Sequence, residues 1–424
     1  MHTSTPSLLT AGTSLQPGGR YRWFVVFLLF LATTINYLDR QLIGLLKPIL
    51  ETEFAWTETD FSRIVIAFTA AYALGLLVFG WFIDRVGTRI GYAVAVALWS
   101  IAGMAHALAR SVVGFGLARI GLELTEAGNY PVAVKTVAEW FPEKERALAT
   151  GLFNAGTSLG VVATLLIVPG IVSRYGWQEA FWITGALGFV WLAVWLIFYD
   201  VPVRQKRLGA AELAYITAGR DPAESARVVR WNQLFRYLKT WALIVGKGLI
   251  DPIYWFFLFW LPSYFSSTFN LDLKKPSLKL MLIYLATTVG SIGGGYLSSK
   301  LIRWGWRVLQ ARKTVLLGIA LLEISVLGIQ FVTDVWVAVG LISLAVALHQ
   351  AWATNIFTLV SDLFPRQTVS SVVGIAGMAG SVGGIFFRCW SERYSIPTRR
   401  PTTSPVVTTC CSLSAAAHTW WPDY

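Results

Sequence analysis

The sequence predicts an all-α membrane protein made of two related halves. The chain has 424 residues, of which 55% are hydrophobic and 14% charged, and its mean hydropathy is +0.58. Soluble domains carry about a quarter charged residues. Eleven segments of about 20 apolar residues recur along the chain, and each could cross roughly 30 Å of hydrocarbon as a helix. Two segments of the first half also match two segments of the second half.

The apolar segments divide the chain into parts. The predicted helices begin near Trp23, Ile64, Tyr92, Val112, Leu148, Gln178, Trp241, Leu280, Thr314, Val335 and Val369. We expect an N-terminal tail over 1–20, a six-helix bundle over 21–200, a linker over 201–239, a bundle with five recognisable helices over 240–388 and an aberrant, disordered tail over 389–424. The first helix is too long for a cleaved signal and lacks a small-residue cleavage site.

Basic residues gather in alternate loops, which is the positive-inside pattern of a membrane protein. The predicted cytosolic side includes Arg20, the linker and the loops after Ile83 and Lys300, so the N-terminus is expected in the cytosol. Lys274, Lys275 and Lys279 are an exception on the outer side that could attract an anion. This distribution favours a lipid bilayer over a nucleic acid as the partner of a chain with net charge +12.

The two halves contain matching segments, as transporters built from repeats do. "AEWFPEKERALATGLFNAGTSLG" from Ala138 aligns without gaps with "SDLFPRQTVSSVVGIAGMAGSVG" from Ser361, and "GLLVFGWFIDR" aligns with "GSIGGGYLSSK". Two six-helix halves require a twelfth helix after Phe387, but the residues there hold no apolar run long enough to span. We interpret the tail as the product of a reading-frame shift; a genuine divergent soluble tail is the alternative.

A short glycine-rich turn joins the second and third predicted helices. In "GWFIDRVGTR", Gly80 permits close helix approach, Gly87 supplies a tight turn, and Arg85 and Arg89 stay on the cytosolic face. The pattern resembles the signature loop of the major facilitator superfamily. That resemblance implies the major facilitator fold of two pseudo-symmetric six-helix bundles, with Asp84 and its arginines as a cytosolic gating latch. A loop that only sets topology is the alternative.

Charged residues inside apolar helices point to a polar path, because a central Arg or Asp costs about 2.5 to 3.5 kcal/mol in a membrane. "NYLDRQ" places Asp39 and Arg40 in the first helix, where an Asp–Arg pair that only ties helices together is the alternative. In the fourth helix, Arg119, Glu123 and Glu126 share a face, so Arg119 can pair with Glu123 while Glu126 changes protonation.

Two helices of the second half carry similar groups. Lys247, Asp251 and Tyr254 recur at i, i+4 and i+7 in the seventh helix, where Lys247 either binds substrate or neutralises Asp251. The tenth helix groups polar and aromatic residues that form a site or pack against neighbours and lipid: His349, Gln350, Trp352, Asn355 and Thr358.

A closer resemblance rests on "NYLDRQ", "LTEAGNYP", "AEWFPEKERALATG", "DPIYWFFLFWLP" and "HQAWATNIFTLVSDLFP". These motifs, over roughly 21–386, look like the anion:cation symporter family and most like bacterial hexuronate transporters. The resemblance implies that Arg40 clamps a substrate carboxylate and that Asp39 and Glu126, beside Arg119, take up protons. It also implies that Tyr37 and Tyr72 line the sugar site; Lys247, Trp352 and Asn355 complete the expected binding residues.

The sequence therefore predicts a proton-coupled symporter of a sugar acid, galacturonate or glucuronate, working by alternating access as a monomer. Another organic anion, such as an aldonate, tartrate or an aromatic acid, is the first alternative, and a sensor that binds without translocating is the second. We expect no enzyme, cofactor or metal, because no nucleophile–base pair or metal-ligand cluster occurs among the spans. Cys389, Cys410 and Cys411 are the chain's cysteines, so its membrane body has no disulfide framework.

Overall fold

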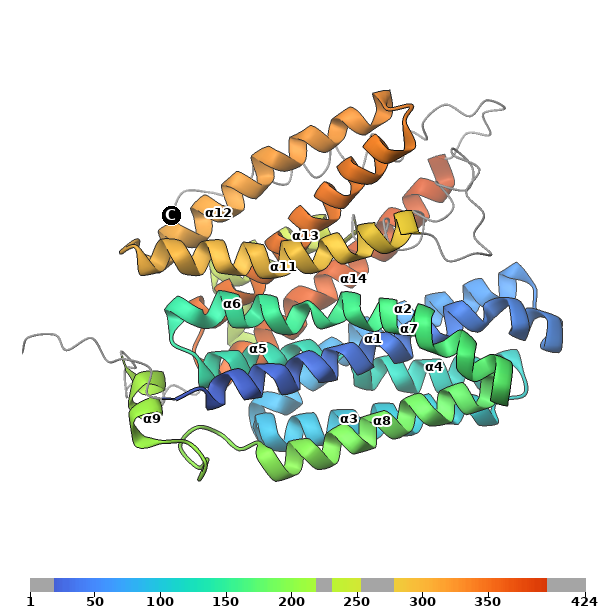
Figure 1. Ribbon diagram of the computed structural model, residues 1–424, viewed down its shortest axis with the longest axis horizontal. Helices are drawn as coiled ribbons and strands as arrows, with labels where there is room; N and C mark the ends of the chain where they lie inside the picture. The colour runs from blue at the N-terminus through green and yellow to red at the C-terminus, as the bar shows by residue number, and fades with distance from the viewer. Residues whose placement is uncertain (1–18, 219–230, 253–277, 395–424) are drawn as a thin grey trace, which may run out of the picture.

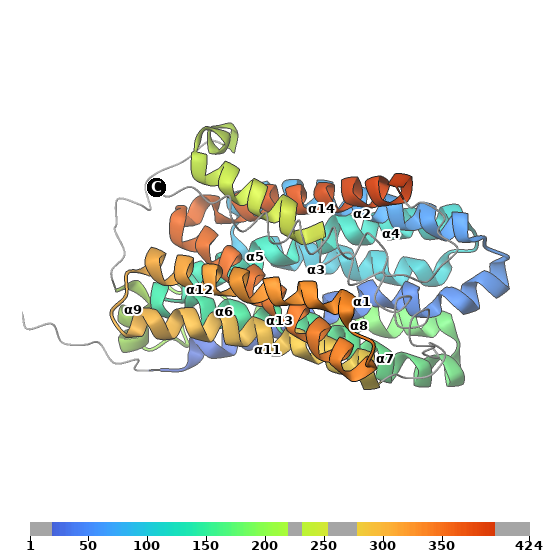
Figure 2. The same cartoon turned by 90° about the horizontal axis from the view of Figure 1, so that it is seen from above.

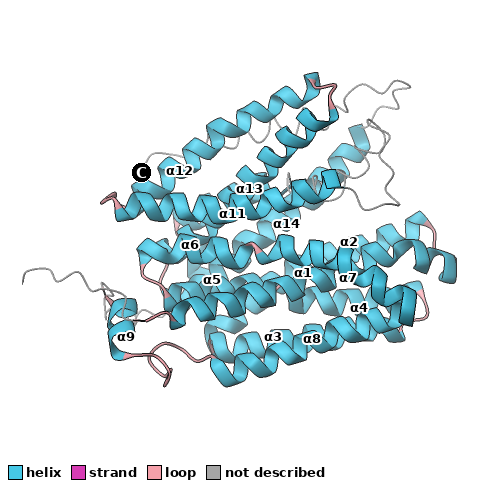
Figure 3. Ribbon diagram, viewed as in Figure 1, coloured by secondary structure: helices cyan, strands magenta, loops and turns pink. Residues whose placement is uncertain are grey.

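The structure is a computed structural model that describes residues 19–218, 231–252 and 278–394. Within these ranges all regular elements are helices, and no strand is found there (Figure 3). The predicted residues Tyr254, Lys274 and Lys275, and the tail from residue 395 onward, lie outside the described ranges. The absence of a twelfth helix therefore stays a prediction.

The first half consists of long helical passes that run back and forth along one axis (Figure 1). The fourth and fifth passes are each built from two helices in succession, α4 with α5 and α6 with α7. The elements of this half are α1 (Tyr21–Phe54), α2 (Glu58–Val86), α3 (Thr88–Ala105), η1 (His106–Leu108), α4 (Val112–Glu126), α5 (Asn129–Trp140), α6 (Glu143–Asn154), α7 (Gly156–Tyr175) and α8 (Trp177–Phe198).

The second half packs against the first, with α14 along α2 and α11 along α6 (Figure 2). Its described elements are a helix over 238–252, α11 (Leu278–Arg303), α12 (Val308–Glu323), η4 (Ile324–Phe331), α13 (Val335–Leu363), η5 (Arg366–Thr368) and α14 (Val369–Tyr394). Seven of the described helical stretches are long and apolar enough to cross a membrane. Many of their large apolar side chains face outward, including Leu166, Val190 and Ile197, as contact with hydrocarbon requires.

The predicted helix positions agree with the structure, and the differences have a simple cause. Helices begin at the predicted Val112, Val335 and Val369. α2, α6 and α12 begin earlier than predicted, at Glu58, Glu143 and Val308, because their first turns are polar and hydropathy marks only the apolar part of a helix. α14 also continues past the predicted boundary at 388, to Tyr394.

Glycines shared by the two sequence repeats make the contacts between the halves. A Cβ on Gly80 of α2 would lie 2.7 Å from the Ser370 carbonyl oxygen of α14, and the equivalent Gly295 of α11 packs still more closely on the Ala147 carbonyl of α6. Gly151 of α6 and its repeat partner Gly374 of α14 complete these two interfaces from the other side. Small residues allow such close backbone approach. The glycines that repeat in the sequence therefore occupy equivalent positions at the two helix interfaces.

A short helix in the linker, α9 (Ala210–Thr217), docks on the beginning of α1. Glu212 accepts hydrogen bonds from the backbone N–H groups of Tyr21 and Arg22, at 3.1 and 3.2 Å, and pairs with the Arg22 guanidinium at 2.9 Å. Burial and the neighbouring Glu145 raise the pKa of Tyr215, which donates a hydrogen bond of 2.8 Å to that carboxylate. We call the end of the molecule that holds Tyr21 and α9 the linker end.

Candidate functional site

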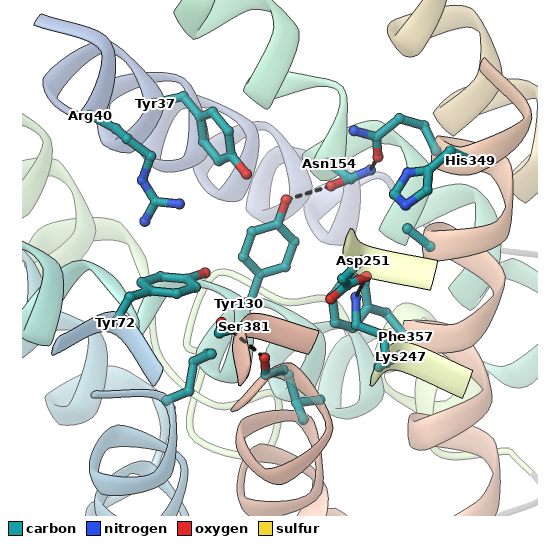
Figure 4. A pocket seen from close by; sticks show the side chains of 15 residues that line it. Tyr37, Arg40, Tyr72, Tyr130, Asn154, Lys247, Asp251, His349, Phe357 and Ser381 are labelled. Atoms are coloured by element: carbon teal, nitrogen blue, oxygen red, sulfur yellow. Dashed lines mark hydrogen bonds and ion pairs between the residues drawn. The ribbon is translucent and has the colours of Figure 1, made fainter. Parts of the chain in front are cut away.

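A pocket that contains charged, polar and apolar side chains lies between the two halves (Figure 4). Its first-half wall comes from α1, α2, α5 and α6, and its second-half wall comes from the 238–252 helix, α13 and α14. The first-half residues are Tyr37, Arg40, Tyr72, Leu76, Tyr130 and Asn154. The second-half residues are Lys247, Asp251, His349, Gln350, Ala353, Phe357, Val373, Gly377 and Ser381.

Arg40 is the centre of a buried ion cluster in the first-half wall. Its Nε and Nη2 atoms each lie 3.2 Å from Oε2 of Glu126, and Nη2 is also 3.2 Å from Glu123. Arg119 pairs with Glu123 at 3.4 Å and donates a hydrogen bond of 2.8 Å to the carbonyl of Arg40. The structure thus brings together Arg40, Arg119 and Glu126 as the sequence predicts, with Glu123 between them.

Aromatic rings surround the Arg40 guanidinium. Its carbon lies 4.5 Å from the ring centre of Tyr72, 5.2 Å from Tyr37 and 5.7 Å from Phe68. Rings at this distance attract a cation through their quadrupole and restrict its motion. Tyr37 and Tyr72 therefore line the pocket and hold Arg40 in position, and their expected contact with a sugar remains a prediction.

Asp39 lies away from this pocket. Its buried carboxyl group is directed toward Thr184 of α8 and Arg119 of α4, and it is not among the residues that line the cavity. Successive residues on an α-helix are turned by about 100°, so Asp39 and its neighbour Arg40 cannot face the same space. The Asp39 carboxyl group interacts electrostatically with Arg119, which donates a hydrogen bond to the Arg40 carbonyl.

The second-half wall holds its own ion pair. Lys247 Nζ lies 2.8 Å from Asp251 Oδ1 and 4.5 Å from the ring centre of Phe357. The Tyr130 ring of the first half stacks on Phe357 with ring centres 5.0 Å apart. Lys247, Phe357 and Tyr130 thus form a column that crosses between the halves.

Hydrogen bonds between uncharged groups also cross the pocket. Asn154 accepts a bond of 2.7 Å from the Tyr130 hydroxyl and donates to Ser291 of α11 and Gln350 of α13, at 2.9 and 3.0 Å. The sequence analysis did not single out Tyr130 or Asn154 as site residues. The available signal was an amide in the middle of an apolar pass, which is a weaker indication than a charge.

Trp352 and Asn355 lie outside the pocket lining, although they share α13 with residues that line it. The Asn355 side chain accepts a hydrogen bond from Ser298 and donates to the Gly294 and Ala351 carbonyls at 3.3 and 2.9 Å. This face of α13 packs on α11. Trp352 is buried within the protein.

Asp84 of the signature loop joins α2 to the second half. Its carboxylate pairs with Lys135 at 2.8 Å and accepts hydrogen bonds from the backbone N–H groups of Ser370 and Ser371, at 3.3 and 2.8 Å. These groups belong to the first turn of α14, where an anion is stabilised by free donors and the helix dipole. Asp84 therefore ties the first half to the N-terminus of α14.

The loop's other residues act within the first half. Arg85 lies over the Trp81 ring at 4.6 Å, and Arg89 pairs with Asp200 at 2.9 Å. Gly87 adopts φ 85°, a left-handed conformation that suits glycine, between α2 and α3. The contact with the second half is thus made by Asp84 and the close-packed Gly80, with Lys135 in place of the expected arginines.

A second ion network closes the linker end. Asp362 of α13 pairs with Arg146 of α6 at 3.0 Å and with Arg312 of α12 at 3.1 Å. Arg146 also donates to the Ser361 carbonyl at 2.9 Å, and Arg312 to the Glu143 carbonyl at 3.3 Å. The two halves are bound together at this end, while α12 and α13 tilt away from the first half toward the opposite end (Figure 1).

Comparison with protein families identifies this architecture. The sequence model of the protein family described as the Major Facilitator Superfamily matches residues 29–387. The chain belongs to this superfamily. Among solved structures, the proton:xylose symporter XylE aligns with a TM-score of 0.73 at 14% identity, over 94% of this chain and 95% of that one. This likeness confirms the predicted fold, and the superfamily explains why the pocket lies between two bundles.

Curated relatives are similar over most of the chain. The hexuronate transporter of Escherichia coli is 34% identical over 370 residues, which cover 86% of each protein. The galacturonate transporter of Dickeya chrysanthemi is 33% identical over 280 residues, or 65% of this chain and 81% of that one. Both relatives are named as transporters of sugar acids.

Proposed function

We propose that the protein is a proton-coupled symporter that carries a sugar acid, a hexuronate such as galacturonate or glucuronate, by alternating access. The observation that carries this proposal is the buried Arg40–Glu126 pair, whose arginine lines the pocket between the two bundles. A guanidinium engages a carboxylate through two parallel hydrogen bonds, which suits Arg40 to an organic anion. The similarity to hexuronate and galacturonate transporters supports the same substrate class.

Glu126 pairs with the Arg40 guanidinium and so competes with the substrate carboxylate for it. When Glu126 takes up a proton, its attraction for Arg40 falls, and the guanidinium becomes available to the incoming carboxylate. Glu123 remains 3.2 Å from Arg40 and limits the cost of leaving a buried cation unpaired. Substrate and proton thereby bind together, which is the basis of coupling.

A charge count suggests the stoichiometry. The cluster contains two arginines and three acids when Asp39 is included with Glu123 and Glu126. A bound carboxylate adds one further negative charge, so a neutral loaded site takes up two protons, one on Glu126 and one on Asp39. With a monovalent acid, each cycle then carries one net positive charge, worth about 2.3 kcal/mol per 100 mV.

Alternating access uses the two networks at the linker end. We propose that this end is cytosolic, as the positive-inside pattern predicts, in a multi-pass protein of the bacterial inner membrane. Opening toward the cytosol then requires Asp84 to leave α14 and Asp362 to leave Arg146. The halves pivot around the pocket, and the protein acts as a transporter and not as an enzyme.

The test is uptake of labelled galacturonate by the purified monomer in proteoliposomes with an imposed proton gradient. We expect gradient-driven accumulation in the parent protein and its loss in Arg40→Ala, because the guanidinium supplies the two parallel hydrogen bonds that hold the carboxylate. Arg204→Ala, an exposed linker residue, is the matched control and should transport normally. Undiminished uptake by Arg40→Ala would contradict the assigned role of Arg40. Absence of sugar-acid uptake by the parent protein would contradict the proposed function.

A further inference from the structure

Lys247 and Asp251 are a charged pair that the Arg40 mechanism leaves unused. Both line the pocket, and Figure 4 shows them beyond Tyr130 from Arg40, so the pocket has an ion pair in each half. Their side chains are 7% and 16% exposed, which leaves them in contact with a ligand while protecting them from bulk water. Because Arg40 already binds the substrate carboxylate in the proposed mechanism, the Lys247–Asp251 pair must contact another part of the ligand.

The structure holds this pair in place. Lys247 and Asp251 are one turn apart on the same helix, and the ammonium group rests over the Phe357 ring at 4.5 Å. On the other side, the Asp251 carboxylate lies over Gly380 of α14, in space that a Cβ at residue 380 would occupy. Asp251 is therefore a fixed part of the second-half wall.

The two ion pairs differ in how they can respond to an arriving anion. Arg40 is shared by Glu123 and Glu126, so one carboxylate can be neutralised while the other still balances the guanidinium. Lys247 is paired with Asp251, and neutralising that carboxylate leaves an ammonium group without this counter-ion. An intact Lys–Asp pair attracts a second carboxylate through Lys247 but repels it through Asp251, at nearly the same distance.

Hydroxyl groups suit such a pair better than a carboxylate does. A hydroxyl can donate a hydrogen bond to the Asp251 carboxylate and accept one from Lys247, so adjacent hydroxyls of a sugar satisfy both charges. The ring stack of Tyr130 and Phe357 next to the pair offers an apolar surface for the carbon skeleton. A carboxylate at the same place would receive one favourable contact and one unfavourable contact.

We propose that the Lys247–Asp251 pair receives the hydroxyl-bearing end of the substrate and excludes a second carboxylate. This inference rests on the proposed function and narrows it, because the pocket then accepts sugar monoacids and rejects sugar diacids of the same length. Arg40 binds the carboxylate end of the substrate, and the Lys247–Asp251 pair forms hydrogen bonds with hydroxyls at the other end. The pair is thus a determinant of specificity.

The test is inhibition of labelled galacturonate uptake by galactonate and galactarate, which share a six-carbon skeleton but carry one and two carboxylates. In the parent protein, we expect galactonate to inhibit at least tenfold more strongly than galactarate. Asp251→Asn removes the repulsion and keeps the cation, so galactarate inhibition should strengthen at least tenfold relative to galactonate. The double variant Lys247→Gln/Asp251→Asn lacks both charges and should not show this gain.

The ratio of the two inhibition constants is measured within each variant, so it does not depend on how much protein folds. Equal inhibition by galactonate and galactarate in the parent protein would overturn the inference and leave the proposed function standing. An unchanged ratio in active Asp251→Asn would also overturn it, and if that variant does not fold, the parent ratio decides. A parent protein that transports no sugar acid would refute the proposed function itself.

Discussion

Replacing Asp84 with Asn should open the linker end. In the structure, Asp84 pairs with Lys135 and accepts two backbone hydrogen bonds from the first turn of α14. Hydrogen bonds to a charged group contribute about 1.5 to 3 kcal/mol, and a charge at a helix N-terminus adds about 0.3 to 1 kcal/mol. Asn keeps one acceptor oxygen but loses the charge. We therefore expect about 3 kcal/mol, or roughly a hundredfold shift toward the open linker end.

The assay is a distance measurement by pulsed electron paramagnetic resonance. Spin labels at cysteines replacing Lys144 and Arg307 report on the separation of the halves, since both positions are exposed near the linker end. The native cysteines all lie at or beyond Cys389 and can be replaced with serine. Asp84→Asn should add a longer distance to the distribution.

The matched control is Asp200→Asn, which breaks the 2.9 Å ion pair with Arg89 inside the first half. It removes a carboxylate near the same end without touching a contact between the halves. We expect the distance distribution of this control to match that of the parent. Equal distance distributions for Asp84→Asn and the parent would refute the role of Asp84 in holding the halves together. An equal shift in Asp84→Asn and Asp200→Asn would refute it as well.

Three further predictions concern packing and binding. Gly151→Val should lower the melting temperature, since a Cβ there meets α11, whereas Gly170→Val faces open space; equal melting temperatures would contradict this packing. Asp362→Asn should cost about 3 kcal/mol of stability in thermal unfolding, because two buried arginines lose a charged partner; unchanged unfolding would count against it. Tyr130→Phe should raise the KM for galacturonate about fivefold through one lost hydrogen bond, and an unchanged KM would show that this hydroxyl does not order the site.

Helix positions could be predicted from the sequence because they depend on local hydropathy. The same is true of the Arg119–Glu123 pair, which lies within one helix at i, i+4. The repeat alignment also predicted equivalent glycines, and the structure shows that Gly80 and Gly295 serve equivalent interfaces. These features follow from residues that are close in sequence or repeated in it.

The orientation of buried helices could not be predicted in this way. α13 is buried on most sides around residues 345–361, so its hydrophobic pattern does not distinguish the pocket face from the α11 face. His349 and Gln350 line the pocket, whereas Trp352 and Asn355 do not. The expected binding roles of Trp352 and Asn355 remain predictions, and uptake by Trp352→Ala and Asn355→Ala would test them.

Partners that are distant in sequence were also beyond the sequence analysis. Asp84 binds Ser371 across 287 positions, and no pattern near either residue indicates the other. Tyr130 and Asn154 were missed for a different reason, because uncharged polar residues are less conspicuous in apolar helices than charged ones. Charge alone drew attention to Arg40 and Lys247, which line the pocket, but also to Asp39, which does not. The hydrogen-bonded part of the pocket required the structure.

The most direct test of coupling is Glu126→Gln, compared with the exposed control Glu179→Gln. Glutamine keeps the shape of the side chain next to Arg40 but cannot cycle a proton. If Glu126 couples proton and substrate, this variant should retain galacturonate counterflow and lose most of the accumulation driven by the proton gradient, because only the Asp39 proton remains, while the control retains both. Full gradient-driven accumulation by Glu126→Gln would contradict the account.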